Sequence, residues 1–206
     1  ICIDFSTISP AASARFADRL RAGGISFLDA PVSGGVKGAE AATLSIMIGG
    51  AAEVLIKAMP LLRLLGEKIT HIGPSGAGQV AKACNQIITA VGVASVAEAL
   101  NFAARSGADG AKVREALLGG SAQSRVLDLF GGRMVARDFR PGVEARLHHK
   151  DFGLVLREAA DLGAPLPISA QVWQQLNALM GREMAHDDTA SLLRVLELTD
   201  AGGSQP

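Results

Sequence analysis

The β-strand patterns of this sequence are confined to its first 75 residues, and this asymmetry limits the folds that the chain can adopt. Over residues 1–75, short apolar runs of strand length alternate with amphipathic segments, which is typical of α/β structure. From Ser75 onward the apolar residues recur with helical spacing alone. The sequence therefore predicts an α/β domain over residues 1–75 and an all-α domain over residues 76–206, with the boundary near residues 73–78.

Cap and turn residues set the limits of the expected elements. Ser9 and Pro10 supply an N-cap and a first helical residue, so a helix should begin there and end near Gly23. The segment 33–42 joins two expected strands and is too short for a helical crossover, which favours an antiparallel or mixed sheet edge. The expected strands are 1–5, 26–30, 43–48 and 68–72, the other expected helices are 52–65, 77–105, 110–118, 124–134, 146–162, 167–180 and 189–198, and a frayed tail is expected at 201–206.

The first expected strand begins at residue 1 with no preceding partner. A continuous apolar strand such as Ile1-Cys-Ile-Asp-Phe5 needs neighbours on both sides to satisfy its backbone hydrogen bonds. We therefore expect the chain to be the C-terminal part of a longer protein.

Composition and charge exclude several classes of partner. With 49% hydrophobic and 19% charged residues, the chain has ample material for a packed core. Its formal net charge is zero and its pI is about 7.1, so neither nucleic acid nor an anionic membrane surface is an expected partner. The two cysteines, Cys2 and Cys84, lie in apolar segments without a signal peptide, which favours reduced thiols and a cytoplasmic location.

Residues 87–104 are long and apolar enough to be mistaken for a membrane span, with Glu98 as their single charged side chain. Asn85, Gln86 and Asn101 flank or interrupt the stretch, and no positively charged flank sets an orientation, so we do not expect it to cross a membrane. A helix that is apolar on all sides is a central one, buried between domains or subunits. The stretch therefore predicts a homo-oligomer, a dimer or a tetramer.

An apolar strand breaks into a glycine-rich loop at Ser33-Gly34-Gly35. Glycine allows positive φ and lets a ligand approach the backbone, and successive N–H groups then form a concavity that binds a carboxylate or phosphate. The loop thus predicts a site for a small acidic substrate. The alternative is a tight turn between two strands, which an isolated Ser-Gly-Gly more often forms.

Lys82 is a single ammonium group among apolar residues in the first turns of the long helix. Gln79, Lys82 and Asn85 are spaced by three, so they should project from one face and meet the same ligand. Burial would lower the pKa of Lys82 towards the working pH, as a general acid or base requires. The alternative is a lysine at a helix end whose ammonium group extends to solvent.

The segment Gly76-Ala-Gly78-Gln-Val-Ala81 matches a dinucleotide-binding pattern. That pattern also needs a second strand with an acidic residue about 20 positions on, whereas here a long helix continues. We interpret these glycines instead as letting the helix begin close to the sheet.

The run His148-His149-Lys150-Asp151 is a polar cluster within an apolar helical pattern. Adjacent histidines point to different helix faces, so metal binding is not expected. Lys150 and Asp151 are the better functional candidates, with a solvated helix end as the alternative.

These motifs, in this order, resemble those of the β-hydroxyacid dehydrogenase family, and the resemblance covers essentially the whole chain. It rests on Asp4-Phe-Ser-Thr-Ile-Ser-Pro10 as the cofactor-contacting strand end, residues 29–39 as the substrate loop, residues 76–86 as the catalytic helix, and His149-Lys-Asp151 as the C-terminal signature. The fold implied is the C-terminal part of a Rossmann-like dinucleotide-binding domain, followed by a helical substrate and dimerisation domain with a long interdomain helix.

The resemblance implies a role for each matching residue. Lys82 would be the catalytic residue. The substrate, a small carboxylate, would be bound by Ser33, Gly34, Gly35 and Asn85, and the nicotinamide cofactor, NAD or NADP, would be contacted by Thr7 and Lys150. The family's glycine-rich nucleotide loop is expected upstream of Ile1, so the chain alone is expected to be inactive, and the choice between NAD and NADP stays open.

The activity implied is hydride transfer between a nicotinamide cofactor and a small 3-hydroxy acid or semialdehyde, most closely the reduction of 2-hydroxy-3-oxopropionate (tartronate semialdehyde). Residues 83–88, 119–125 and 139–142 are more similar to that branch than to the hydroxyisobutyrate branch. Oxidation of 3-hydroxyisobutyrate is the alternative. A non-catalytic helical dimerisation module is an alternative of another class, although the pair of Lys82 and Asn85 argues against it.

Overall fold

The computed structural model describes residues 1–197, and their contacts divide the chain into two compact units. The first unit contains Ile1–Gln86 and Arg157–Leu162, and the second contains Ile87–Leu156 together with the described residues from Gly163 onward. Helix α4 (Ala77–Arg105) contributes its first ten residues to the first unit and the rest to the second. The boundary expected between residues 75 and 76 stays a prediction, and the expected tail at 201–206 lies outside the described residues.

The first unit is built on a mixed sheet. Strand β1 (Cys2–Asp4) pairs in parallel with β2 (Phe27–Asp29), and β4 (Leu44–Gly50) pairs in parallel with β5 (Gly66–Gly73). Strand β4 is antiparallel to both β2 and β3 (Val32–Ser33). The mixed sheet edge predicted from the short segment 33–42 is therefore confirmed.

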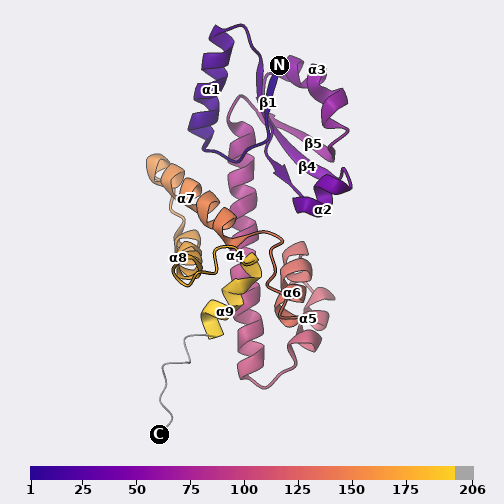
Figure 1. The fold of residues 1–206 in the computed structure, drawn as a ribbon, viewed down its shortest axis with the longest axis vertical. Helices are drawn as coiled ribbons and strands as arrows, with labels where there is room; N and C mark the ends of the chain where they lie inside the picture. Colours follow the sequence, from indigo (N-terminus) through magenta and orange to yellow (C-terminus); the bar gives the residue numbers. More distant parts are fainter. Residues whose placement is uncertain (198–206) are drawn as a thin grey trace. The chain divides into compact units, whose positions relative to one another are not determined.

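Two helices cover this sheet. Helix α1 (Pro10–Ala22) contacts β2, whereas α3 (Ala52–Leu62) contacts β4 and β5, and they lie on either side of the strands (Figure 1). The predicted start of α1 is confirmed, because Ser9 Oγ accepts a hydrogen bond from Ala12 N at 3.2 Å and Pro10 is the first helical residue. Helix α3 packs on a core whose fully buried side chains include Leu28, Ile46, Ile48 and Leu62.

A short helix, α2 (Gly35–Glu40), lies where the sequence analysis expects only a connecting segment. Its six residues, Gly-Val-Lys-Gly-Ala-Glu, contain two glycines and no repeated apolar position, so they carry little periodic signal. The loop at Ser33 is therefore a turn from strand to helix rather than a tight turn between two strands.

Within the described residues, the regular elements of the second unit are all helical, as predicted, and one isolated antiparallel bridge joins Glu144 to Asp188. Its elements besides α4 are α5 (Gly110–Leu118), the π-helical turn η1 (Leu127–Gly131), α6 (Gly132–Val135), α7 (Ala145–Leu162), α8 (Pro167–Gly181), the 3-10 turn η2 (Thr189–Ser191) and α9 (Leu192–Glu197). The end of α7, Arg157–Leu162, belongs to the first unit. The single helix expected at 124–134 is instead η1 followed directly by α6. The expected end of the last helix, residue 198, lies outside the described residues.

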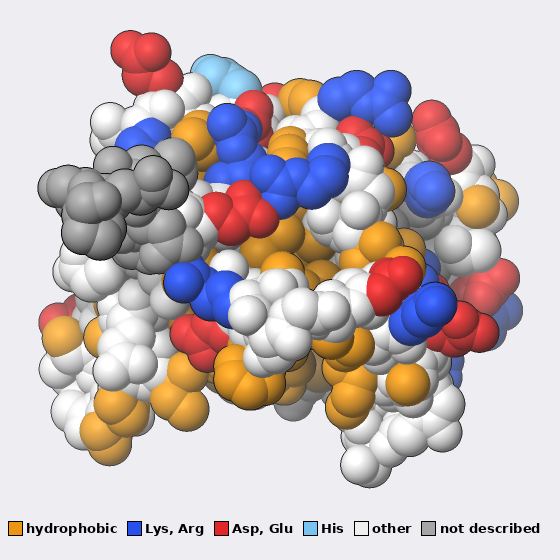
Figure 2. All heavy atoms as spheres, turned by 90° about the horizontal axis from the view of Figure 1, so that it is seen from below, with side chains coloured by type: hydrophobic (Ala, Val, Ile, Leu, Met, Phe, Trp, Pro, Cys, Tyr) orange, Lys and Arg blue, Asp and Glu red, His pale blue; other side chains and the backbone are white. Residues whose placement is uncertain are grey.

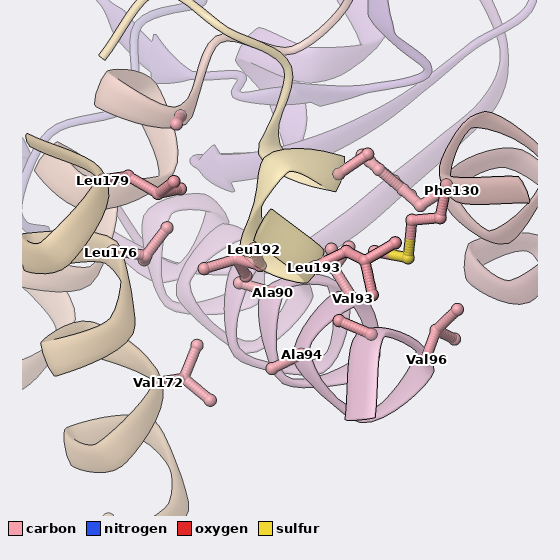
Figure 3. Packing of buried hydrophobic residues seen from close by; sticks show 14 of the residues in the cluster. Ala90, Val93, Ala94, Val96, Phe130, Val172, Leu176, Leu179, Leu192 and Leu193 are labelled. Atoms are coloured by element: carbon pink, nitrogen blue, oxygen red, sulfur yellow. The ribbon is translucent and has the colours of Figure 1, made fainter. Parts of the chain in front are cut away.

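One face of α4 forms the centre of the helical unit. Small side chains of α4, such as Ala90 and Val93, meet Phe130 of η1, Leu176 of α8 and Leu192 of α9 in a single core (Figure 3). Small residues on a central helix let its neighbours approach closely. The core of this unit thus follows from the alanine- and valine-rich composition of α4.

The other face of α4 stays uncovered in the chain. Ile88 and Phe102 are 72% and 73% exposed. By length and composition alone α4 could cross a membrane, with 39% of its most apolar window buried, but the same helix supplies the core just described. The sequence predicts that α4 is buried on all sides. Burial of the face that carries Ile88 and Phe102 would require contacts beyond the single chain.

Candidate active site

Lys82 lies beside the glycine-rich loop of the α/β unit. Its Nζ donates a hydrogen bond to the carbonyl oxygen of Val32 at 2.8 Å, and the side chain is half-buried. Val32 directly precedes Ser33 in the chain. The structure therefore brings the predicted proton donor to the start of the predicted substrate loop, although Lys82 and Val32 are 50 positions apart in the sequence.

The loop itself depends on two consecutive glycines with positive φ. Gly34 has φ of 141° and Gly35 has φ of 64°, both in the region that L side chains rarely adopt. A Cβ on Gly34 would lie 3.0 Å from Leu44 Cδ2, whereas a Cβ on Gly35 would meet nothing within 4 Å. The backbone at Gly35 is thus open to an approaching ligand.

Asn85 is half-buried and lies three residues after Lys82 on α4. Its Nδ2 donates to Gln86 Oε1 at 2.8 Å, which orients the amide. Gln86 is itself buried. The substrate contact assigned to Asn85 stays a prediction.

The side chain of Gln79 does not share a ligand site with Lys82 and Asn85, although the three residues are spaced by three. The side chain is 1% exposed, its Nε2 donates to Ser6 O at 2.8 Å, and its Oε1 accepts from Ile8 N at 3.2 Å. Both polar atoms are thus engaged by the backbone, so the expectation that Gln79 shares a ligand with Lys82 and Asn85 is wrong. The physical reason is that the first turn of α4 packs against the segment after β1, which covers this part of the helix surface.

Asp29 is a residue of the site to which sequence reasoning gives no role. It is 0% exposed, and its carboxylate accepts from Gly76 N at 2.7 Å and from Gln79 N at 3.1 Å. These N–H groups belong to the beginning of α4, where helix donors lack partners within the helix. A helix N-terminus also favours a negative charge. Asp29 therefore holds the start of α4 against the end of β2.

The glycine interpretation of the segment 76–81 is confirmed. A Cβ on Gly78 would lie 2.5 Å from Met47 O and 2.8 Å from Asp29 Oδ2. No side chain fits at such distances, so Gly78 lets α4 begin in contact with the sheet. The helix then continues to Arg105, as the sequence predicts.

Lys150 and its neighbours lie on α7 in the helical unit. Lys150 Nζ is 2.9 Å from Asp151 Oδ1, with the lysine side chain 52% exposed and the aspartate side chain 7% exposed. His148 contacts Thr189 Oγ1, and His149 stacks on Trp173. Within the described residues, no group of three metal-ligating side chains occurs. The cofactor contact assigned to Lys150 stays a prediction.

Charges of both signs are interspersed on the surface. On the face that Figure 2 shows, Lys and Arg side chains lie next to Asp and Glu, with hydrophobic side chains between them. A groove that binds nucleic acid would instead concentrate positive charge. On this face the charges of the described residues are mixed in sign rather than concentrated in one patch.

Comparison with known proteins decides the family. A model described as the NAD binding domain of 6-phosphogluconate dehydrogenase matches residues 1–73, and one described as NAD-binding of NADP-dependent 3-hydroxyisobutyrate dehydrogenase matches residues 76–196. The chain belongs to the β-hydroxyacid dehydrogenase family. The predicted family and the predicted fold class, a Rossmann-like part followed by a helical part, are thus confirmed, as is a nicotinamide dinucleotide as the cofactor of the family.

Two curated proteins are among the relatives to which this chain is similar. It is 44% identical to 2-hydroxy-3-oxopropionate reductase of Escherichia coli K12 over 95% of the chain and 67% of that protein. It is 40% identical to 3-hydroxyisobutyrate dehydrogenase of Pseudomonas aeruginosa over 82% of the chain and 59% of that protein. The chain thus spans about two thirds or less of the length of these relatives.

A solved structure confirms the fold independently. 3-Hydroxyisobutyrate dehydrogenase of Mycobacterium tuberculosis, a structure described with L-serine, superposes with a TM-score of 0.87 at 33% identity. The superposition covers 94% of this chain and 69% of that one. Both parts of the chain therefore have counterparts in a solved member of the family.

Proposed function

We propose that the full-length protein carrying this chain reduces 2-hydroxy-3-oxopropionate, a three-carbon semialdehyde acid, with NADH or NADPH. The observation that carries the proposal is the hydrogen bond from Lys82 Nζ to Val32 O, at the entrance of the Ser33–Gly35 loop. It supports the proposal because the Lys82 ammonium group lies next to open backbone that would suit a carboxylate. The 44% identity to the E. coli 2-hydroxy-3-oxopropionate reductase supports this substrate.

Substrate binding is assigned to the loop and to Asn85. Ser33, Gly34 and Gly35 hold the carboxylate through backbone N–H groups and the Ser33 hydroxyl, because positive φ at successive glycines turns N–H groups towards a common point. Asn85, oriented by its bond to Gln86, donates to a substrate hydroxyl. These contacts fix the reacting carbon relative to Lys82, which lowers the entropic part of the barrier.

Lys82 supplies the proton. A bound reduced nicotinamide would supply the hydride, and negative charge would then develop on the carbonyl oxygen of the aldehyde. The Lys82 ammonium donates a proton to that oxygen, and in the reverse direction the neutral amine accepts it. Its bond to Val32 O keeps Nζ at the loop through the reaction.

The residues that follow β1 and β3 fit a nicotinamide ring near the carboxyl ends of these strands. A Cβ on Gly35 would meet nothing within 4 Å, so the open backbone there leaves room for a ligand. Thr7 lies between two backbone groups that Gln79 holds, and it is assigned the contact with the ring. Lys150 is assigned a contact with the same cofactor.

3-Hydroxyisobutyrate is the second candidate substrate, favoured by the 40% identity to the P. aeruginosa enzyme. The test is a substrate panel on the full-length protein, with 2-hydroxy-3-oxopropionate and 3-hydroxyisobutyrate each assayed with both cofactors. We expect the higher kcat/KM for 2-hydroxy-3-oxopropionate. Turnover of neither substrate would leave the non-catalytic helical module as the better account.

The proposal includes a homo-oligomer, a dimer or a tetramer, in the cytoplasm. Ile88 and Phe102 are exposed on α4, and 14 residues of helix at 100° each bring them to nearly the same face. Burial of two large apolar side chains against a second copy would stabilise the assembly by about 3–6 kcal/mol before entropic costs. Cys2 and Cys84 are both exposed and unpaired, as thiols in a reducing compartment can be.

A further inference from the structure

The buried amide of Gln79 joins α4 to the segment that follows β1. Its Nε2 donates to Ser6 O and its Oε1 accepts from Ile8 N, so the two bonds hold the backbone on either side of Thr7. Only one orientation of an amide offers a donor to the carbonyl and an acceptor to the N–H. Gln79 itself is 1% exposed, so its amide is shielded from water, which strengthens the hydrogen bonds that it makes. The segment at Thr7 is therefore held in a single register relative to α4.

The carboxylate of Asp29 binds the backbone N–H of Gln79. Its Oδ2 accepts from Gln79 N at 3.1 Å and its Oδ1 accepts from Gly76 N at 2.7 Å. A Cβ on Gly49 or on Gly78 would come within 3.0 Å of the Asp29 carboxylate, so two glycines leave the space that this carboxylate fills. The first turn of α4 is thus anchored to β2 at the same residue that holds the Thr7 segment.

Lys82 follows Gln79 by three residues on the same helix. Its Nζ contacts Val32 O, and Val32 follows Asp29 by three residues. These contacts link α4 to three segments. Gln79 joins it to the backbone on either side of Thr7, Asp29 joins it to the end of β2, and Lys82 joins it to Val32. Rates of such reactions depend on separations, because a shift of about 1 Å can cost about 100-fold in rate.

We propose that Gln79, anchored by Asp29, is a positioning residue that sets the separation between Thr7 and the ammonium group of Lys82. The proposal rests on the proposed function, in which Thr7 contacts the cofactor and Lys82 donates the proton. Gln79 acts through backbone groups, because both of its polar side-chain atoms bond to Ser6 and Ile8.

The first test is Gln79→Met in the full-length protein, which keeps the length of the side chain and removes both hydrogen bonds. We expect kcat to fall about tenfold to 100-fold with a smaller change in substrate KM. The deuterium isotope effect with reduced nicotinamide labelled at C4 should rise, because a misaligned hydride transfer limits turnover more strongly. Assays are made well below the Tm of the variant.

The matched control is Leu62→Val, which opens a small cavity in the same α/β core on α3, at a side chain that is 0% exposed. This variant should lower Tm without raising the isotope effect. A fall in kcat and a rise in the isotope effect that Leu62→Val reproduces at an equal loss of Tm would overturn the proposal. So would a Gln79→Met variant that keeps the kcat and the isotope effect of the wild type.

Gln79→Glu provides a second test that does not depend on the fold tolerating methionine. A protonated carboxyl both donates and accepts, as the amide does, whereas a carboxylate only accepts and repels Ser6 O. Activity relative to wild type should therefore be retained at low pH and fall as pH rises through the pKa of the introduced carboxyl, which burial raises. Asp4, which accepts from Ser6 N, Asp29 and Lys82 are the charged side chains beside these contacts, and the wild type carries all three.

A Gln79→Glu profile parallel to that of the wild type at all pH values would count against the positioning role. Failure of the proposed function can be distinguished from failure of the positioning role. In that case Lys82→Met would keep its turnover, whatever the Gln79 variants do. If Lys82→Met is inactive and Gln79→Met is normal, the proposed function stands and the positioning role fails.

Discussion

A side chain at position 78 and the carboxylate of Asp29 exclude one another, since a Cβ built on Gly78 lies 2.8 Å from Asp29 Oδ2. The same Cβ would lie 2.5 Å from Met47 O, a backbone atom of β4 that cannot rotate away. Close approach of α4 to the sheet therefore requires glycine here, and the buried carboxylate requires that approach for its bond to Gln79 N.

We predict that Gly78→Ala destabilises the α/β unit by about 1–3 kcal/mol, although alanine has the higher helix propensity. The strain must be relieved by moving α4 away from β2 and β4, which also weakens the anchor at Asp29. Thermal unfolding of the full-length protein measures the loss as a lower Tm. Gly181→Ala is the control, because a Cβ at the end of α8 meets nothing within 4 Å, and it should change stability by less than about 0.5 kcal/mol. Equal Tm values for the two variants would contradict the packing argument.

Lys82→Met removes the proposed proton donor and roughly keeps helix propensity and side-chain volume. Turnover of the full-length enzyme should fall by about 10²- to 10⁴-fold, because a positioned general acid contributes that much. The affinity for reduced cofactor, measured by calorimetry, should change little. Near-normal turnover together with a lowered Tm would make Lys82 a structural residue that only bonds Val32 O.

Asn85→Ala should have a milder effect than Lys82→Met. The amide holds the substrate and transfers no proton, so its loss should raise the substrate KM and slow turnover by about tenfold. Steady-state kinetics with varied substrate separates the two parameters. An unchanged KM with a loss of kcat as large as that of Lys82→Met would instead assign Asn85 to the proton transfer.

The sequence was sufficient for the parts of the fold that depend on local signals. Ser9 and Pro10 predict the start of α1, and the change from strand to helical periodicity predicts the order of the elements. Helix α2 is not predicted from the sequence, because its six residues include two glycines and show no periodic apolar pattern. The prediction of this fold thus failed where the segment was too short for periodicity to be read.

The site was predictable only in part, since its geometry depends on contacts distant in sequence. The interpretation of Lys82, Asn85 and the Ser33 loop came from their chemistry and from the family resemblance. Asp29 and Gln79 bond to groups 47 to 73 positions away, and no spacing rule points to such partners. The rule that residues three apart share a face holds for Gln79, but neighbouring backbone already covers that face.

Arg140 and Asp138 form an ion pair on the surface of the helical unit, and its contribution to stability depends on pH. The hydrogen bond from Arg140 lowers the pKa of Asp138 from 3.8 to about 2. A lowered pKa in the folded state stabilises the protein above the pKa of the unfolded state, and this contribution is lost as pH falls through about 2. Arg140→Gln should therefore lower Tm slightly at pH 5 and by less near pH 2, where the contribution is being lost. A Tm difference that is the same at both pH values would show that the ion pair is not its cause.

The exposed apolar face of α4 gives the last prediction. If Phe102 is buried between copies of the chain, Phe102→Lys places a charge in that interface and should shift the full-length protein towards monomer, as buried charges without partners are strongly unfavourable. Light scattering coupled to size exclusion measures the mass directly. The matched control is Leu162→Lys, at an equally exposed leucine of 74% on the last turn of α7, which should leave the mass unchanged. A wild-type protein that is monomeric at high concentration would contradict the prediction, since Phe102 would then be exposed to water in the native state.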